Sequence, residues 1–198
     1  MSMELITKLR EMTSAGISDC KKALDASKND IDKAVQWLRE KGMASAVKRA
    51  GRSAKQGLVH SYIHGNGTLG VLVEVNCETD FVAKTEAFQT LVKEIAMQIA
   101  AVSPLFITRD QVTEAVLKAE KEIYKAQLKE EGKPEKVWDK IIEGKIEKFY
   151  SQICLYDQIY MRDTAGKQTV KNLIDEAIGK IGENIVVKKF ARFKLGEE

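Results

Sequence analysis

Proline, histidine and cysteine are scarce in this sequence of 198 residues, which has two prolines, two histidines and three cysteines. Because proline interrupts helices, so few prolines leave room for long continuous ones. Cys20, Cys77 and Cys154 are far apart, and no pair has the spacing of zinc ligands. His60 and His64 have a spacing that suits zinc on a helix, but they lie in a strand-like run, and we interpret them as surface residues. No metal or cofactor is therefore expected, and the cysteine pattern indicates a reducing compartment.

The sequence also lacks any long apolar run. No stretch approaches the length of a membrane span, and the N-terminus does not have the basic and then apolar order of a secretory signal. No membrane partner is expected, and the predicted location is the cytoplasm. The net charge of +3 is too small to indicate a nucleic-acid partner, so direct nucleic-acid binding is not expected either.

Residues 1–43 are predicted to form three short helices that pack as a small docking module. Ser18-Asp19 is expected to cap the second helix and Asn29-Asp30 the third, and Gly42 is expected to end the third. A bundle of this size buries little surface and often serves to dock on another protein. Apolar residues recur at helical spacing in each segment: Leu5, Ile6, Leu9 and Met12, then Ala23 and Leu24, then Ile31, Ala34, Val35 and Leu38.

Residues 44–56 are small and basic and are predicted to be a linker. A patch that binds RNA phosphates is the alternative. The linker interpretation is favoured because no aromatic residue is interleaved with the charges.

Residues 57–198 are predicted to form an α+β core domain with a small three-stranded antiparallel sheet. Asn66-Gly67 between the apolar runs 58–64 and 69–77 indicates a hairpin, and residues 184–195 are expected to add the third strand. Helices are predicted over 86–101 and 170–181. The spacing of Gly65, Gly67 and Gly70 matches a dinucleotide-binding motif, but it lies between two strands and not before a helix, so we reject that interpretation.

An antiparallel coiled-coil hairpin is predicted at about residues 112–153 of this domain. Two apolar seams with alternating spacings of three and four are separated by a break at Gly132 and Pro134. Thr108 and Gln111 form a capping-box pattern ahead of the first helix. The expected seams are Val112, Val116, Ala119, Ile123 and Ala126 in the first helix, and Ile142, Ile146, Phe149, Ile153 and Tyr156 in the second.

The run Val75–Lys84 contains the junction between a strand and a helix. In one interpretation Phe81 is a core residue and Asp80 is a helix N-cap. In the other, Phe81 projects from the corner as a wedge and the Asp80 carboxylate acts beside it. Local pattern alone favours the core interpretation.

Several motifs, in order along the chain, resemble the bacterial elongation factor Ts family. The corner 78–84 resembles the signature of that family, and residues 9–24 resemble its N-terminal module, with Ile17 and Ser18 at positions where methionine is frequent. Further similarity lies at 131–135, 143–145, 182–187 and 190–193. The resemblance therefore covers almost the whole chain.

This resemblance implies a guanine-nucleotide exchange factor for elongation factor Tu that binds its GDP-bound and nucleotide-free forms. A ubiquitin-associated-like N-terminal module would dock on the partner through Arg10 and Ile17, with the contribution of Ser18 reduced. Thr79, Asp80, Phe81 and Val82 would enter near the partner's magnesium and phosphate site. The corner element occurs once in this sequence, as in the short form of the family. In that form two copies of the protein could act together, so a second copy of this chain, forming a homodimer, is among the expected partners.

Two other classes of function fit the sequence less well. The sequence offers no nucleophile–base pair, phosphate loop or catalytic histidine, so we do not expect an enzyme. A ubiquitin- or RNA-binding adaptor would use the small bundle and the basic linker, but it leaves the hairpin and the corner without a role.

Overall fold

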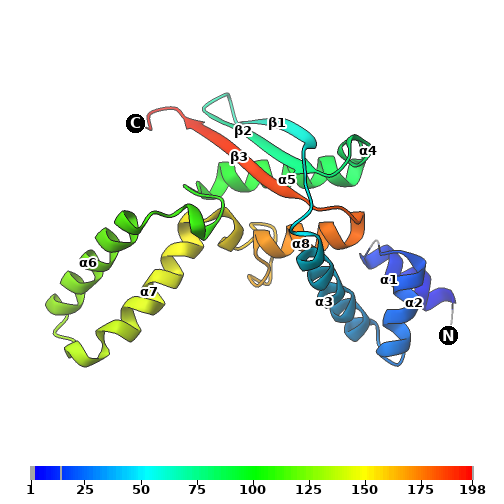
Figure 1. Cartoon of the computed structure of the whole chain (residues 1–198), viewed down its shortest axis with the longest axis horizontal. Coiled ribbons are helices and arrows are strands. Elements are labelled where there is room, and N and C mark those ends of the chain that lie inside the picture. The colour runs from blue at the N-terminus through cyan, green and yellow to red at the C-terminus, as the bar shows by residue number, and fades with distance from the viewer. Residues whose placement is uncertain (1–2, 14, 198) are drawn as a thin grey trace. The chain divides into compact units, whose positions relative to one another are not determined.

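A computed structural model of the chain describes residues 3–13 and 15–197. Those residues form eight α-helices, three short 3-10 helices and three strands in one sheet (Figure 1), which confirms the predicted α+β class. They divide into two compact units. The first lies within residues 3–60, 73–94 and 172–190, and the second within 61–72, 95–171 and 191–197.

The sheet has the strand order β1 (Gln56–His64), β2 (Leu69–Cys77) and β3 (Val186–Lys194). A four-residue loop joins β1 to β2, as the hairpin prediction required, and a loop this short joins only antiparallel strands. The backbone N–H of Leu195 donates to the carbonyl of Thr68, whereas Lys189 pairs with Glu74. Position along β3 therefore rises as position along β2 falls, so this pair is also antiparallel. The predicted three-stranded antiparallel sheet is confirmed.

One face of the sheet is buried. Helices α5 (Glu86–Val102) and α8 (Val170–Ile181) lie on the same side of the strands (Figure 1), and both were predicted from their apolar spacing. Alternate residues of β2 point to this side, as a strand's two-residue period requires. The buried residues are Val71, Val73, Val75 and Cys77 on β2, Phe88, Val92, Ile95 and Ile99 on α5, and Ile174 and Ile178 on α8.

Helices α1 (Met3–Thr13), α2 (Ile17–Ala26) and α3 (Ile31–Arg49) pack around one apolar cluster that includes Leu9, Cys20 and Leu24. Asp30 caps α3 as predicted, accepting from the Lys33 N–H at 3.0 Å. The expected cap at Ser18-Asp19 is wrong, because α2 already begins at Ile17 after Gly16. Met12 was expected on the inner face, but it is exposed.

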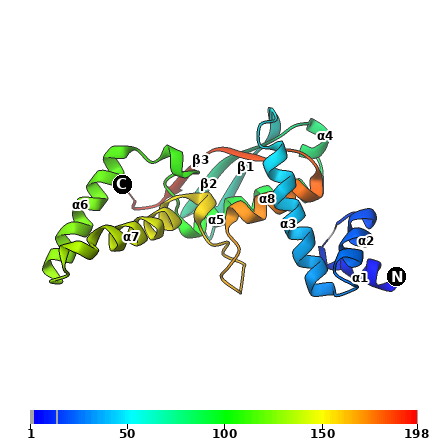
Figure 2. The ribbon, with the colours of Figure 1, turned by 60° about the horizontal axis from the view of Figure 1, so that its bottom comes forward.

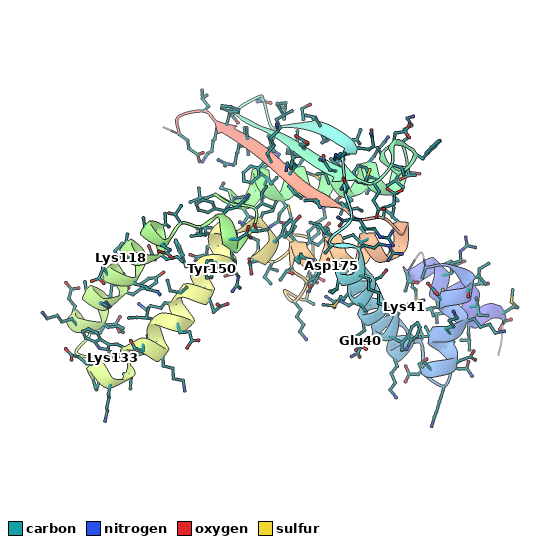
Figure 3. The ribbon with its side chains drawn as sticks, in the orientation of Figure 1. Glu40, Lys41, Lys118, Lys133, Tyr150 and Asp175 are labelled. Atoms are coloured by element: carbon teal, nitrogen blue, oxygen red, sulfur yellow. The ribbon has the colours of Figure 1, made fainter. Side chains whose placement is uncertain are left out.

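Helix α3 does not end at Gly42 but continues to Arg49, so residues 44–49, which were expected to belong to a linker, are helical. Gly42 lies where α3 crosses α8: a Cβ built on Gly179 would lie 2.6 Å from the Gly42 Cα. Near the crossing, Arg39 pairs with Glu176 at 3.1 Å. Figure 3 shows Asp175 of α8 beside α3. A mid-helix glycine costs about 1 kcal/mol relative to alanine, and packing against α8 offsets this cost.

Helices α6 (Glu114–Glu130) and α7 (Trp138–Ile153) lie side by side in opposite directions in both views (Figures 1 and 2). Ile142 and Ile146 of α7 face inward as predicted. Val112, the first residue of the other expected seam, is buried against Ile153 just ahead of α6, but the rest of that seam is wrong. Val116, Ala119, Ile123 and Ala126 are exposed, and the residues that pack against α7 are Leu117, Tyr124 and Leu128.

Short 3-10 turns flank this hairpin: η1 (Arg109–Gln111), η2 (Glu135–Val137) and η3 (Leu155–Asp157). The predicted capping box of Thr108 and Gln111 is present, but it closes η1, and α6 is capped by Thr113. Tyr156 lies in η3, beyond the end of α7, so it does not continue the α7 seam.

Candidate functional site

The strand-to-helix corner is formed by the end of β2 and a single helical turn, α4 (Asp80–Ala83), just before α5. Thr79 is the N-cap of α4: its Oγ1 accepts from the Val82 N–H at 3.3 Å. The expectation that Asp80 is the cap is therefore wrong, and Asp80 occupies the first turn.

Phe81 is 78% exposed, which overturns the interpretation that it is a core residue. On one turn of helix only one side can face the interior, and here Ala83 is buried there while Val82 is half-buried. The Phe81 ring is thus on the opposite side, in solvent. An exposed aromatic on a defined backbone is suited to insertion into a partner's apolar crevice.

Asp80 is also at the surface, next to Phe81. Its Oδ2 lies 2.7 Å from the Lys84 Nζ, one helical turn further on, and both side chains are at least half exposed. The hydrogen bond from Lys84 lowers the pKa of the Asp80 carboxyl. The corner therefore presents a ring and an ionised carboxylate together.

The corner is fastened to the chain just after α8. Glu183 accepts hydrogen bonds from the backbone N–H groups of Glu78 and Thr79 and from the Thr79 hydroxyl. In return, Glu78 accepts from the backbone N–H of Asn184. Sequence reasoning missed Glu183 and Asn184, because Gly182 and the residues after it were interpreted only as a helix stop and the start of a strand.

A second candidate surface lies on the N-terminal helices. A hollow of about 400 Å³ is lined by residues of α1 and by Ile17 at the start of α2. It brings together Arg10 and Ile17, which the sequence predicted as docking residues. Ser18 is exposed but does not line the hollow. The lining residues are Met3, Ile6, Thr7, Arg10, Glu11 and Ile17.

Both surfaces offer contacts with a partner: an apolar tip, a hollow and exposed charges. Across residues 3–13 and 15–197, no three His, Cys, Asp or Glu side chains are grouped so as to hold a metal ion. In the same residues no helix is long and apolar enough to cross a membrane. The chemistry that the described corner and hollow can supply is that of binding, through apolar burial and ion pairing.

A comparison with protein families places this chain. The model of the family described as Elongation factor TS matches residues 3–197. Elongation factor Ts of Caldanaerobacter subterraneus subsp. tengcongensis is 56% identical over 197 residues, which cover 100% of this chain and 98% of the relative. Elongation factor Ts of Thermotoga neapolitana is 55% identical over 198 residues, with coverage of 100% and 98%. Elongation factor Ts of Moorella thermoacetica is 56% identical over 189 residues, with coverage of 96% and 92%. The chain belongs to the elongation factor Ts family.

Proposed function

We propose that the chain is a guanine-nucleotide exchange factor for elongation factor Tu in protein synthesis. It binds the GDP form of that partner, promotes release of GDP, remains bound to the nucleotide-free form, and leaves when GTP enters. The observation that carries this proposal is the exposure of Phe81 at a braced corner, in a chain that belongs to this family.

At the corner, Thr79, Asp80, Phe81 and Val82 make the contact that changes nucleotide affinity. The Phe81 ring enters an apolar crevice of the partner near its magnesium and phosphate site. The Asp80 carboxylate disturbs the hydrogen bonds that hold the magnesium ion. Support comes from the exposure of the ring and from the exposed Asp80 carboxylate next to it, which is ionised near neutral pH as ordinary aspartates are.

The N-terminal helices dock on the partner's nucleotide-binding domain. We assign to them a ubiquitin-associated-like fold, with Arg10 and Ile17 as the docking residues and Ser18 at the edge of the contact. Support comes from the hollow that Arg10 and Ile17 line together. The proposed division is a docking module at 1–43 and a core domain at 57–198, joined by residues 44–56, of which 44–49 continue helix α3.

The helical hairpin of α6 and α7 is proposed to act as a coiled-coil arm that makes a further contact. Lys145 bridges the two helices, donating to the side chain of Gln127 at 2.8 Å and lying over the Tyr124 ring at 5.0 Å. At the base, Arg109 contacts Glu147, Asp157 and the Tyr150 ring. Figure 3 shows Tyr150 on α7 near this end, while Lys133 lies at the opposite end, between the two helices. These contacts suit an arm of fixed shape.

The exchange reaction proposed here involves no covalent step and no cofactor of the chain itself. If this chain weakens the binding of GDP to elongation factor Tu, then GDP must weaken the binding of this chain to elongation factor Tu by the same factor, because the two affinities are linked. A coupling on the order of a hundredfold or more in affinity is what the corner has to supply. We place this activity in the cytoplasm, and we propose that two copies of the chain associate.

Release of a fluorescent GDP analogue from elongation factor Tu tests the proposal. The chain, added in increasing amounts, is expected to accelerate release to a limiting rate. A wild-type chain that leaves the release rate unchanged would refute the exchange function. Retention on ubiquitin or RNA resin at moderate salt, without acceleration of release, would favour an adaptor instead.

A further inference from the structure

The direction of the Phe81 side chain has to be set by the backbone. The ring is exposed, so the packing of the ring itself does not hold it. Helix α4 has only four residues, and an isolated turn of this length is not stable in water. After the turn, the N–H groups of Lys84 and Thr85 donate to the carbonyls of Phe81 and Val82. Before the turn, Glu78 and Thr79 set the direction in which it leaves β2.

Glu183 holds those two residues with both oxygens of its carboxylate. Its Oε2 accepts from the backbone N–H of Glu78 and from that of Thr79, each at 3.0 Å. Its Oε1 accepts from the Thr79 hydroxyl at 2.7 Å. The hydroxyl proton thus points at Glu183, which leaves a lone pair of the same oxygen free to cap the Val82 N–H. The carboxylate orients the cap that starts the turn.

Hydrogen bonds between the corner and the segment after α8 also run the other way, with the corner supplying the acceptor. Glu78 accepts from the backbone N–H of Asn184 at 2.7 Å and lies 3.5 Å from the Arg52 guanidinium. The buried Asn184 side chain donates to the Arg52 carbonyl at 2.8 Å. Gly182 has a φ of +88°, a conformation that favours glycine, and it turns the chain out of α8 immediately before Glu183. Each segment supplies a carboxylate for the backbone of the other.

We propose that Glu183 is a positioning residue for Phe81 and Asp80: it holds the corner at the angle needed to act on the nucleotide-binding partner. This inference rests on the exchange function proposed above. In this assignment Glu183 acts through Thr79 and makes no contact with the partner. Loosening it lets α4 reorient, so fewer encounters place the ring in its crevice. Docking through Arg10 and Ile17 is unaffected, because those residues lie on α1 and α2.

The variant Glu183→Gln tests this assignment, because it keeps the shape of the side chain and removes the charge. Its amide can no longer accept on both sides. Release of fluorescent GDP from elongation factor Tu is measured against chain concentration, for Glu183→Gln, for wild type and for Glu74→Gln, which neutralises a carboxylate on β2. The limiting rate of Glu183→Gln is expected to be about tenfold to a hundredfold lower, as for loss of charge-assisted hydrogen bonds, with an unchanged half-saturating concentration. Glu74→Gln is expected to match wild type.

The outcomes separate this inference from the function on which it rests. If wild type accelerates release and Glu183→Gln reaches the same limiting rate, the positioning role is refuted and the exchange function stands. A higher half-saturating concentration at an unchanged limiting rate also refutes it, since that pattern is a docking defect. If wild type does not accelerate release, both fall.

Amide hydrogen exchange supplies a readout that does not depend on the partner. In Glu183→Gln the N–H groups of Thr79 and Val82 are expected to exchange faster than in wild type, while those in the middle of α5 do not change. Equal exchange at Thr79 and Val82 in the two proteins would contradict the proposal. If Glu183→Gln does not fold, Thr79→Val removes both the hydroxyl link to Glu183 and the cap on the Val82 N–H, and it is expected to lower the limiting rate in the same direction.

Discussion

Phe81 and Phe88 belong to consecutive helices, and the structure places them in opposite environments: the Phe81 side chain is 78% exposed and that of Phe88 is fully buried. Burying a phenylalanine stabilises a fold by about 1.5–3 kcal/mol, so the exposed ring forgoes stabilisation of that order. An exposed aromatic held at a braced corner fits a contact with another molecule better than a structural role.

The two phenylalanines form a matched pair for mutagenesis. Phe81→Ala is expected to leave thermal stability close to wild type and to slow GDP release from elongation factor Tu severely. Phe88→Ala is expected to lower the free energy of unfolding by about 3–5 kcal/mol, because it opens a cavity under the sheet. Thermal melting and the release assay, run on both variants, check the pair. A large loss of stability in Phe81→Ala with normal release from the folded fraction would contradict the wedge.

The hollow on α1 and α2 leads to a different kinetic prediction. Ile17→Asp places a charge at an exposed apolar position and is expected to raise the half-saturating chain concentration about tenfold or more, as for loss of an apolar anchor. The limiting release rate is expected to stay at the wild-type value, because the corner is intact. Lys33→Ala, on an exposed part of α3, serves as the control and is expected to behave like wild type. A lower limiting rate in Ile17→Asp at an unchanged half-saturating concentration would argue against docking through this hollow.

The crossing of α3 and α8 predicts a strong dependence on glycine at position 179. Gly179→Ala places a methyl group 2.6 Å from the Gly42 Cα, so the backbones must separate, and the melting temperature is expected to fall. Gly144→Ala on α7 is the control, because nothing lies within 4 Å of its Cβ position. There the substitution is expected to stabilise by about 0.5–1 kcal/mol through helix propensity. Equal melting temperatures for Gly179→Ala and wild type would show that the crossing tolerates a side chain.

Helix α6 has two rows of apolar residues, the predicted one with Ile123 and the observed one with Leu128. Substitutions in the two rows are expected to change the free energy of unfolding by different amounts. Leu128→Ala is expected to cost about 2–5 kcal/mol, since Leu128 is buried against α7. Ile123→Ala is expected to change the free energy of unfolding by no more than about 0.5 kcal/mol, since Ile123 lies outside that contact. Urea unfolding followed by helical circular dichroism compares them. A larger cost for Ile123→Ala than for Leu128→Ala would restore the seam expected from the sequence.

The α6 stripes show where sequence reasoning succeeds and where it fails. The helix and its antiparallel partner follow from apolar periodicity and from the break at Gly132 and Pro134. The inward side does not follow, because two apolar stripes lie on the same helix. One contains Val116 and Ile123, the other Leu117, Tyr124 and Leu128. Only the placement of α7 decides between them.

Glycine 42 shows a second limit. Gly is a common helix stop, and a run of small basic residues after it is typical of a linker. The penalty for glycine inside a helix is only about 1 kcal/mol, so one favourable packing contact can reverse the outcome. That contact is with Gly179, which is far away in the sequence. The position of the corner was predictable because it depends on neighbouring residues. Its contact with Glu183 was not predictable, because Glu183 is far away in the sequence.

The close approach of Gly42 and Gly179 fixes the point at which α3 crosses α8. Ile31, the first residue of α3, lies roughly 16 Å from this crossing point at the rise of an α-helix. If α3 tilted by about 10° at the crossing, its first residue would move by about 3 Å, which is enough to take a docking side chain out of contact. The absence of side chains at Gly42 and Gly179 therefore determines how precisely α1 and α2, which pack on the first part of α3, are oriented.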